Sequence, residues 1–261
     1  MKILLTNDDG ILAPGIIALH KSLQGLGELV VIAPKTVQSA MSHGITYTTP
    51  LMTEYVEITP DMSGISVDGR PADCVKVAMR AIWEERYGEG SKPDLTISGM
   101  NSGANVGINI IYSGTVAAAI ESAFLGVPAI AVSLYLADRK NICYNRAAEI
   151  ARHTIDRVLE NNVLPNEVVN INIPVCESDD MAMPTIKVVA MNAAGDMGHY
   201  DKRISPDGRT YYWAAGDGMA FAHTSQGSDV EALKQGFVTV TPLDYVLTNT
   251  DRIGLWRDLL E

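Results

Sequence analysis

The first ten residues, MKILLTNDDG, place the strongest constraint on the fold of this chain. The apolar run from Ile3 to Leu5 shows no alternation with polar residues, which is typical of a strand buried on both faces of a parallel sheet. The run ends in a polar turn, Asn7 to Gly10, that contains the adjacent carboxylates Asp8 and Asp9. Ligands of open α/β sheets bind in the crevice at the carboxyl ends of the strands. The opening segment therefore predicts an α/β fold with an acidic turn at its ligand-binding edge.

The two adjacent carboxylates can share a ligand only if the chain leaves strand geometry, because neighbouring side chains of a regular strand point to opposite faces. Gly10 makes such a turn easy. Two carboxylates about 4 Å apart repel each other by roughly 4 kcal/mol at an effective dielectric constant of 20. A shared proton or a hard cation would remove this repulsion. Alternatively, one aspartate caps the next helix and the other is solvated, and the turn alone does not separate the two interpretations.

A strand–helix–strand unit follows from the pattern of the first 34 residues. Pro14 suits the first turn of a helix, apolar residues then recur at helical spacing as far as Leu26, and Leu29 to Ala33 predicts a second buried strand. The polar loop Lys35 to Gly44 therefore lies at the same sheet edge as the acidic turn. Further strands are predicted over 64–67, 95–98, 130–134 and 168–173, and further helices over 71–86, 116–125 and 145–159.

Two later segments predict contact with a ligand. The loop SGMNSGANVG, residues 98–107, is rich in glycine, asparagine and serine, which suits a backbone that approaches a ligand closely. Ser113, Gly114 and Thr115 then lead into a helix, where free backbone N–H groups and the helix dipole favour an anion such as phosphate. The alternative is that Ser113 or Thr115 is simply the N-cap of that helix, and both interpretations can hold together.

Charge and cysteine usage exclude several classes of protein. The formal net charge of −11 argues against a nucleic-acid polymer or an anionic membrane as partner, but not against a small phosphorylated ligand. The three cysteines are spread along the sequence, which indicates neither a disulfide framework nor a thiolate zinc site and suits a reduced, cytoplasmic protein. The apolar stretch 116–137 is divided by Gly126 and Pro128, so a buried helix and strand explain it better than a membrane span.

The composition becomes acidic and polar after about residue 175. Segments 186–191 and 211–213 are interpreted as strands of one long hairpin, 237–241 as a further strand and 255–260 as a short terminal helix. An arm that packs on another subunit would account for these elements. Tyr211, Tyr212, Trp213 and Phe221 would supply its apolar contacts. The chain is therefore expected to be a single domain over 1–261, with a core over about 1–180 and a C-terminal extension over about 181–261.

Six segments together resemble the SurE family, the survival-protein-E nucleotidases. They are ILLTNDDG, QSAMSHGIT, RPADCVKVA, SGMNSGANVG, YSGTVAAAIESA and GFVTVTPL, in that order along the chain. The resemblance implies a Rossmann-like, three-layer α/β core with a mostly parallel sheet, and a C-terminal β-hairpin and helix extension used in oligomerisation. It also implies one divalent cation per subunit, held by Asp8, Asp9, Ser39 and Asn101. Because all four donors are oxygens, Mg²⁺ or Mn²⁺ is expected rather than zinc.

The resemblance further implies hydrolysis of nucleoside monophosphates by a homodimer or homotetramer. Asp8, Asp9 and Asn101 would act in catalysis, and Ser39, Ser113, Gly114 and Thr115 would bind the substrate. Either aspartate could orient the attacking water or act as a nucleophile, and the sequence does not separate these routes. A nucleotide- or phosphate-sensing module without catalysis is the alternative function. The sequence does not rank the bases, choose between 5′- and 3′-phosphates, or indicate whether short polyphosphates are cleaved.

Overall fold

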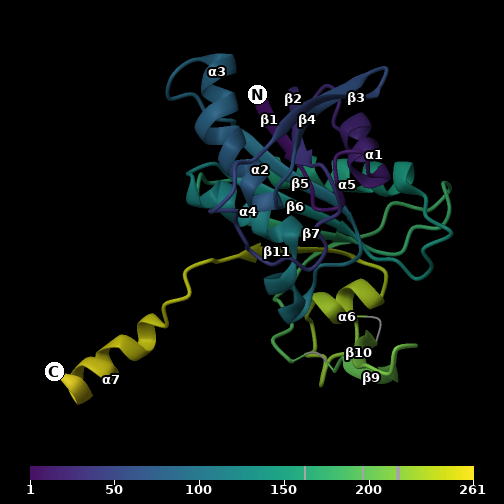
Figure 1. Ribbon diagram of the computed structural model, residues 1–261, viewed down its shortest axis with the longest axis vertical. Coiled ribbons are helices and arrows are strands. Elements are labelled where there is room, and N and C mark those ends of the chain that lie inside the picture. The colour runs from purple at the N-terminus through teal and green to yellow at the C-terminus, as the bar shows by residue number, and fades with distance from the viewer. Residues whose placement is uncertain (162, 196, 216–217) are drawn as a thin grey trace.

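The computed structural model describes residues 1–161, 163–195, 197–215 and 218–261. Its centre is a nine-stranded sheet in the order β3-β4-β2-β1-β5-β6-β7-β11-β8 (Figure 1). The strands of this sheet are β1 (Lys2–Thr6), β2 (Glu28–Pro34), β3 (Thr53–Thr59), β4 (Met62–Val67), β5 (Leu95–Ser102), β6 (Ala129–Leu134), β7 (Val168–Ile173), β8 (Ile186–Val188) and β11 (Val238–Leu243). The six strands from β4 to β7 in this order are parallel, whereas β3 and β11 run antiparallel to their inner neighbours.

Helices cover both faces of the sheet and make the fold three-layered (Figure 1). One face packs against α1 (Pro14–Ser22) and α5 (Tyr144–Leu159). The other face packs against α2 (Pro71–Val77) and α4 (Gly114–Phe124). Helix α2 continues through a π-helical turn, η1 (Ala78–Ile82), into α3 (Trp83–Tyr87). Successive side chains of β1 point to opposite faces of the sheet. Ile3 and Leu5 therefore pack in the core under α1 and α5, and Leu4 packs in the core under α2. The mostly parallel α/β fold is confirmed.

Several helix boundaries follow from local chemistry. Proline occupies the first turn of α1 and of α2, where its missing N–H costs nothing. At α4, the Ser113 hydroxyl accepts the Val116 N–H at 3.1 Å, so Ser113 is an N-cap. The remaining helical elements are a 3₁₀ turn η2 (Gly107–Tyr112), α6 (Asp229–Lys234) and α7 (Thr250–Leu260).

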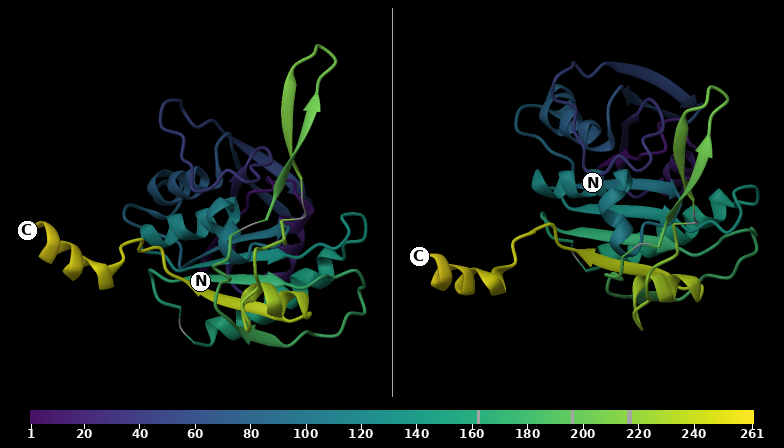
Figure 2. Two further views of the ribbon diagram at one scale, coloured as in Figure 1. Left: turned by 90° about the horizontal axis from the view of Figure 1, so that it is seen from below. Right: turned by 60° about the horizontal axis from the view of Figure 1, so that its bottom comes forward.

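The predicted C-terminal hairpin is wrong in its pairing. Segment 211–213 lies in β10 (Thr210–Ala215), which pairs with β9 (His199–Ile204) rather than with 186–191. Strand β8 instead pairs in parallel with β11 and extends the central sheet, because Ile186 and Val240 complete the apolar face that also contains Val169. Both views in Figure 2 show the β9–β10 hairpin standing away from the body of the molecule.

Candidate active site

The acidic turn lies at the point where the strand order reverses. Strands β1 and β5 are neighbours at the centre of the parallel part of the sheet, and the chain winds outward from them in opposite directions. Such a switch point is where doubly wound sheets bind ligands, because the loops after the two strands separate and leave a crevice. Asp8 and Asp9 follow β1 and Asn101 lies near the end of β5, so all three side chains flank this crevice.

Asp8 is held by the first turn of α4. The Thr115 hydroxyl donates a hydrogen bond to Asp8 Oδ1 at 2.5 Å, and the Thr115 backbone N–H also stabilises the carboxylate. Burial raises the pKa of Asp8 to about 6, with a smaller contribution from the charge of Asp9, and the Thr115 hydrogen bonds oppose this rise. Gly114 allows the close approach, since a Cβ there would lie 2.8 Å from the Asp8 Cβ. The helix N-terminus thus positions a carboxylate that burial keeps close to protonation.

Asp9 and Asn101 each have one side-chain atom tied to the protein. The backbone N–H of Ser102 donates to Asp9 Oδ2 at 2.8 Å, and Asn101 Nδ2 donates to the Gly103 carbonyl at 2.8 Å. Among the described residues, no donor bonds Asp9 Oδ1 or Asn101 Oδ1. Two oriented oxygen atoms therefore remain available to a cation or to a substrate.

An irregularity in β5 turns Asn101 toward the site. The pairing between β5 and β6 shifts between Ser98 and Asn101, where Gly99 and Met100 lie opposite the single residue Val132. A Cβ at Gly99 would lie 2.3 Å from the Val132 carbonyl oxygen, so only glycine fits this bulge. The predicted glycine-rich loop therefore begins as strand, and the bulge within it sets the direction of the Asn101 side chain.

The loop that carries Ser39 is pinned at several points. The Gln38 N–H donates to the Asp8 carbonyl at 2.8 Å, and the Ser42 hydroxyl donates to the Ile111 carbonyl at 2.7 Å. Ala40 and Ser42 adopt left-handed backbone conformations, with φ of 56° and 54°. Strained conformations of this kind persist where the surrounding structure imposes them, often at functional sites.

A buried carboxylate on α4 anchors the end of the same loop. Glu121 accepts His43 Nε2 at 2.8 Å and Lys76 Nζ at 3.2 Å. Burial acts to raise the pKa of Glu121, but the hydrogen bonds from His43 and Lys76 outweigh it and hold that pKa below its ordinary value. His43 also stacks on the Phe124 ring, with the ring centroids 5.4 Å apart. His43 is therefore a structural contact of the loop rather than a group at the acidic turn.

One cavity of about 360 Å³ brings most of the predicted site residues together. It is lined by Asp8, Asp9, Ser39, Ala40, Asn101, Ser102, Gly103, Asn105, Asn109, Tyr112, Ser113, Arg139 and Gly218. Gly114 and Thr115 are not part of this wall, since they lie behind Asp8 in the first turn of α4. Within the described ranges, histidine, cysteine, aspartate and glutamate form no group of three that could hold a metal ion, so a cation here would depend on serine and asparagine as well.

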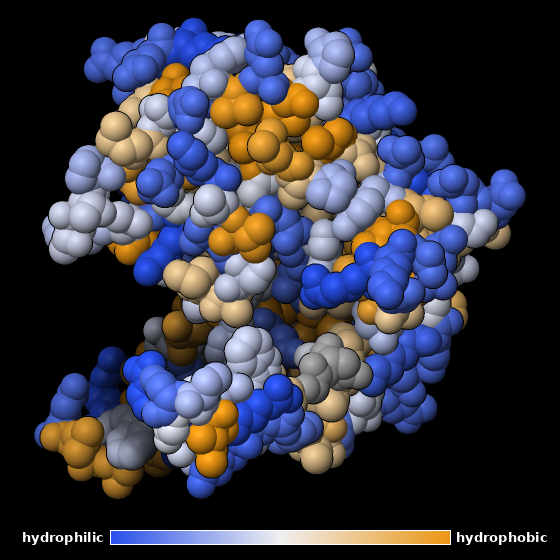
Figure 3. Space-filling model, turned by 45° about the vertical axis from the view of Figure 1, so that its right-hand side comes forward, coloured by the Kyte–Doolittle hydropathy of each residue, from blue (hydrophilic) through white to orange (hydrophobic). Residues whose placement is uncertain are grey.

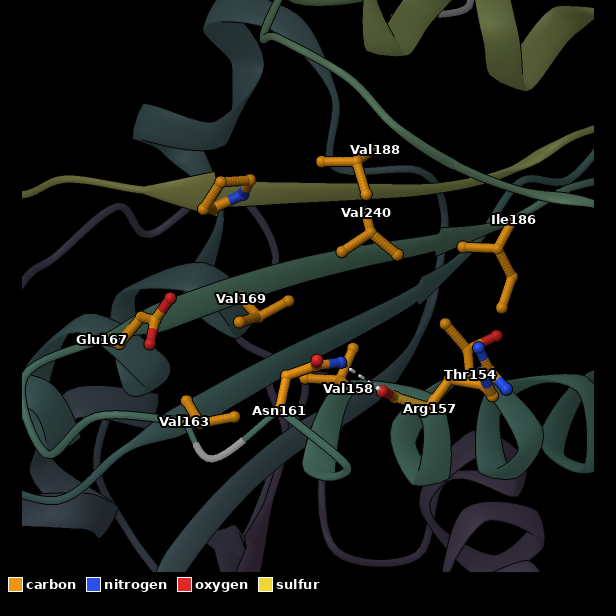
Figure 4. Close-up of a pocket in the computed structure, with 11 residues that line it drawn as sticks. Thr154, Arg157, Val158, Asn161, Val163, Glu167, Val169, Ile186, Val188 and Val240 are labelled. Atoms are coloured by element: carbon orange, nitrogen blue, oxygen red, sulfur yellow. Dashed lines mark hydrogen bonds between the residues drawn. The ribbon is translucent and has the colours of Figure 1, made fainter.

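A second cavity of about 360 Å³ lies between α5 and the outer strands of the sheet. Figure 4 shows Val169, Val240 and Val188 along its strand side, with Val158 and Thr154 facing them from α5. Valine and isoleucine side chains dominate its wall, and it lacks the pair of adjacent carboxylates. Of these two cavities, only the one at the acidic turn is therefore lined by residues of the predicted site.

Several residues of the site were not predicted from the sequence. Asn109, Tyr112 and Arg139 line the cavity and are not among the predicted site residues. Thr115 is predicted to bind the substrate, but its hydroxyl orients Asp8, and the Ser102 backbone orients Asp9. Arg139 follows β6, so the rule that selected the turns after β1 and β5 would have found it if applied to every parallel strand. The Thr115–Asp8 bond joins residues 107 positions apart, and no local pattern indicates it.

Comparison with known proteins agrees with this architecture. The family model described as "Survival protein SurE" matches residues 3–195. The protein named 5'-nucleotidase SurE from Rhodopirellula baltica is 40% identical over 258 residues, covering 99% of this chain and 98% of that protein. Its namesake from Alkaliphilus metalliredigens is 38% identical over 250 residues, covering 95% and 94%. The crystal structure of the SurE protein from Aquifex aeolicus superimposes with a TM-score of 0.81 at 37% identity, over 100% of both chains.

Proposed function

The chain belongs to the SurE family, and we propose that it is a hydrolase that removes phosphate from nucleoside monophosphates. The observation that carries this proposal is the cavity in which an acidic turn, an asparagine, a serine loop and the N-terminal end of a helix converge. The names of the related proteins, which call them 5'-nucleotidases, support the same activity over nearly the full length of the chain. An assay with both classes of substrate decides whether the same site also hydrolyses 3′-nucleotides.

We further propose one Mg²⁺ or Mn²⁺ ion per subunit, held by Asp8, Asp9, Ser39 and Asn101. The donor set fits a hard cation because every donor is an oxygen. Two observations support the fit: the carboxylates of Asp8 and Asp9 are adjacent and repel each other, and Asp9 Oδ1 and Asn101 Oδ1 have no donor among the described residues. The cation would polarise the phosphoryl oxygens and lower the pKa of a water molecule.

The remaining groups of the site would position the phosphate. Free backbone N–H groups at the start of a helix bind anions, and at α4 those of Val116 and Thr115 already bond Ser113 and Asp8. Ser113, which lines the cavity, is therefore the group at this helix end that we assign to the phosphoryl oxygens, whereas Gly114 lies outside the cavity wall and allows α4 to approach Asp8. Thr115 would act through Asp8, whose orientation its hydroxyl fixes. Either aspartate could orient the attacking water or accept the phosphoryl group itself, and trapping of a phosphorylated aspartate would identify the second route.

The C-terminal extension is proposed to join subunits into a homodimer or homotetramer. The β9–β10 hairpin exposes Tyr212 and Trp213, and α7 buries none of its residues in this chain. Phe221, by contrast, is partly buried against the cluster of Val106, Met219, Val230 and Leu233, so less of its ring is free for a partner. The division into a core over about 1–180 and an extension over about 181–261, and a location in the cytoplasm, remain predictions. Among the described residues, no helix has the length and apolar character needed to cross a bilayer.

A single assay tests the proposed reaction. Phosphate release from nucleoside 5′- and 3′-monophosphates is measured with Mn²⁺, with Mg²⁺ and with excess EDTA. Release that requires the cation is expected. Metal-dependent binding of the nucleotide without release would instead identify a sensing module, the non-catalytic alternative.

A further inference from the structure

The cavity at the acidic turn has an unbalanced charge. Two of its lining residues, Asp8 and Asp9, carry carboxylates, and Arg139 is the one lysine or arginine among the described residues that line it. A divalent cation would offset the two carboxylates and leave the site close to neutral. The chain has a net charge of −11, which repels a phosphate dianion. A further positive charge at the cavity wall would therefore strengthen the binding of a phosphate dianion.

Hydrogen bonds hold the segment that carries Arg139 in a defined conformation. It joins β6 to α5, and hydrogen bonds to the segment around the end of β7 hold both ends: Tyr135 N–H to the Ile173 carbonyl at 2.9 Å, and Cys143 N–H to the Cys176 carbonyl at 3.0 Å. Between them, the Asp138 carboxylate accepts the Lys140 N–H at 3.0 Å and the Asn141 amide at 3.3 Å. This Asx-type turn fixes the backbone at Arg139.

The Arg139 guanidinium is exposed at the cavity and, unlike several other arginines of the chain, forms no ion pair among the described residues. Arg146, Arg152 and Arg209 form ion pairs with Glu149, Asp156 and Asp207. Within the described part of the chain, no carboxylate lies within 4 Å of the Arg139 guanidinium, and the nearby Asp138 is already engaged in its turn. An arginine that lines the proposed phosphate-binding cavity and has no partner among the described residues has its donors free for a ligand.

We infer that Arg139 is a substrate-binding residue of this site: its guanidinium binds the phosphoryl oxygens of the substrate. This inference rests on the proposed function. Guanidinium and phosphate match in geometry and form charge-assisted, often bidentate hydrogen bonds. Arg139 therefore recognises the phosphoryl group itself and not the nucleoside attached to it.

The test compares Arg139→Ala and Arg139→Lys with the matched control Lys140→Ala. Lys140 is the next residue of the same turn, its replacement changes the net charge equally, and it does not line the cavity. KM and kcat are measured for a nucleoside monophosphate and for a small aryl phosphate, together with the inhibition constant of inorganic phosphate. For Arg139→Ala, KM and the inhibition constant are expected to rise about tenfold for a lost charge-assisted contact, with kcat changed far less. Arg139→Lys should recover part of the loss, and Lys140→Ala should resemble the wild type.

Two results would overturn the inference. One is an equal effect of Arg139→Ala and Lys140→Ala, which would reduce the role of Arg139 to general charge. The other is a loss restricted to nucleotides, with inorganic phosphate inhibiting as before, which would assign Arg139 to the nucleoside. If the wild type releases no phosphate, the proposed function fails on its own, and calorimetric binding of inorganic phosphate in the presence of Mn²⁺ still compares the same variants.

Discussion

The acidic edge of the sheet and the C-terminal extension depart in opposite ways from the usual distribution of residues. At the edge, polar groups are buried: Asp8 is only 4% exposed and Thr115 is fully buried. In the extension, apolar groups face solvent: Trp213 is 62% exposed and Leu260 is 78% exposed. Figure 3 shows a lower part of the molecule that a deep notch separates from the upper part, with apolar side chains at the surface of both parts.

The comparison indicates two kinds of partner. A carboxylate that is buried beside a second carboxylate is costly, and a bound cation offsets that cost. Aromatic and aliphatic side chains that are exposed to water on a projecting hairpin also cost free energy, and burial against another protein surface offsets that cost. The edge is therefore suited to a small charged ligand, whereas the extension is suited to a second copy of the chain.

The largest expected effect on activity comes from a substitution at the acidic edge, where the cation is proposed to bind. Asp9→Asn keeps the size of the side chain but removes one of the two charges that hold the cation. We expect phosphate release to fall on the order of 10³-fold, the scale of losing a main electrostatic group of an active site. Asp68→Asn makes the same chemical change at an exposed carboxylate and should leave the rate unchanged. Retention of a tenth or more of the activity by Asp9→Asn would remove Asp9 from the ligand set.

The next effect concerns stability and has a defined sign. Because the pKa of Asp8 is raised to about 6 in the folded chain, the cost of ionising its buried carboxylate appears as pH rises from about 4 to above 6. In EDTA at pH 8, Asp8→Asn should therefore be more stable than the wild type by up to about 3 kcal/mol, and the two should converge near pH 4.

Denaturant unfolding of both proteins at the two pH values measures this difference. Addition of Mn²⁺ at pH 8 should reduce or reverse the gap, because a cation that binds only the folded wild type stabilises it. A gap that stays constant from pH 4 to pH 8 would contradict the assignment of the raised pKa to Asp8.

A smaller effect tests how α4 orients Asp8. Thr115→Val keeps the shape of the side chain but removes the hydroxyl that donates to Asp8 Oδ1. The loss of a buried hydrogen bond to a charged group, about 1.5–3 kcal/mol, should lower kcat/KM by about 10- to 100-fold. Thr115→Ser restores the donor and should recover most of the activity. Equal activity of the two variants would show that the hydroxyl does not position the carboxylate.

The smallest effect on activity is expected from the extension. Removal of residues 249–261 deletes α7, which buries no residue in this chain, so the rate per subunit should stay within about twofold. Light scattering should show a smaller assembly if α7 joins subunits. A large loss of activity without a change in mass would overturn the separation of the two regions and assign the extension to the site.

Much of the fold could be predicted because it depends on local patterns. The buried run at Ile3–Leu5, the proline at position 14 and the serine at position 113 each identified the start or end of an element that the structure contains. The C-terminal half was less accessible: β9 and α6 were not predicted, and the partner of β10 was wrong. These elements are short, and β9 and β10 are exposed on both sides, so hydrophobic periodicity carries little information about them.

The sequence by itself determined which residues could form a phosphate- and cation-binding edge, because turns after parallel strands meet at one side of a sheet. Only the tertiary structure decided how those residues are held. The bulge at Gly99 directs Asn101, the Thr115 hydroxyl orients Asp8, and the turn at Asp138 brings Arg139 to the same cavity. These relations join segments far apart in the chain, and their hydrogen bonds exist only once the strands and helices have packed.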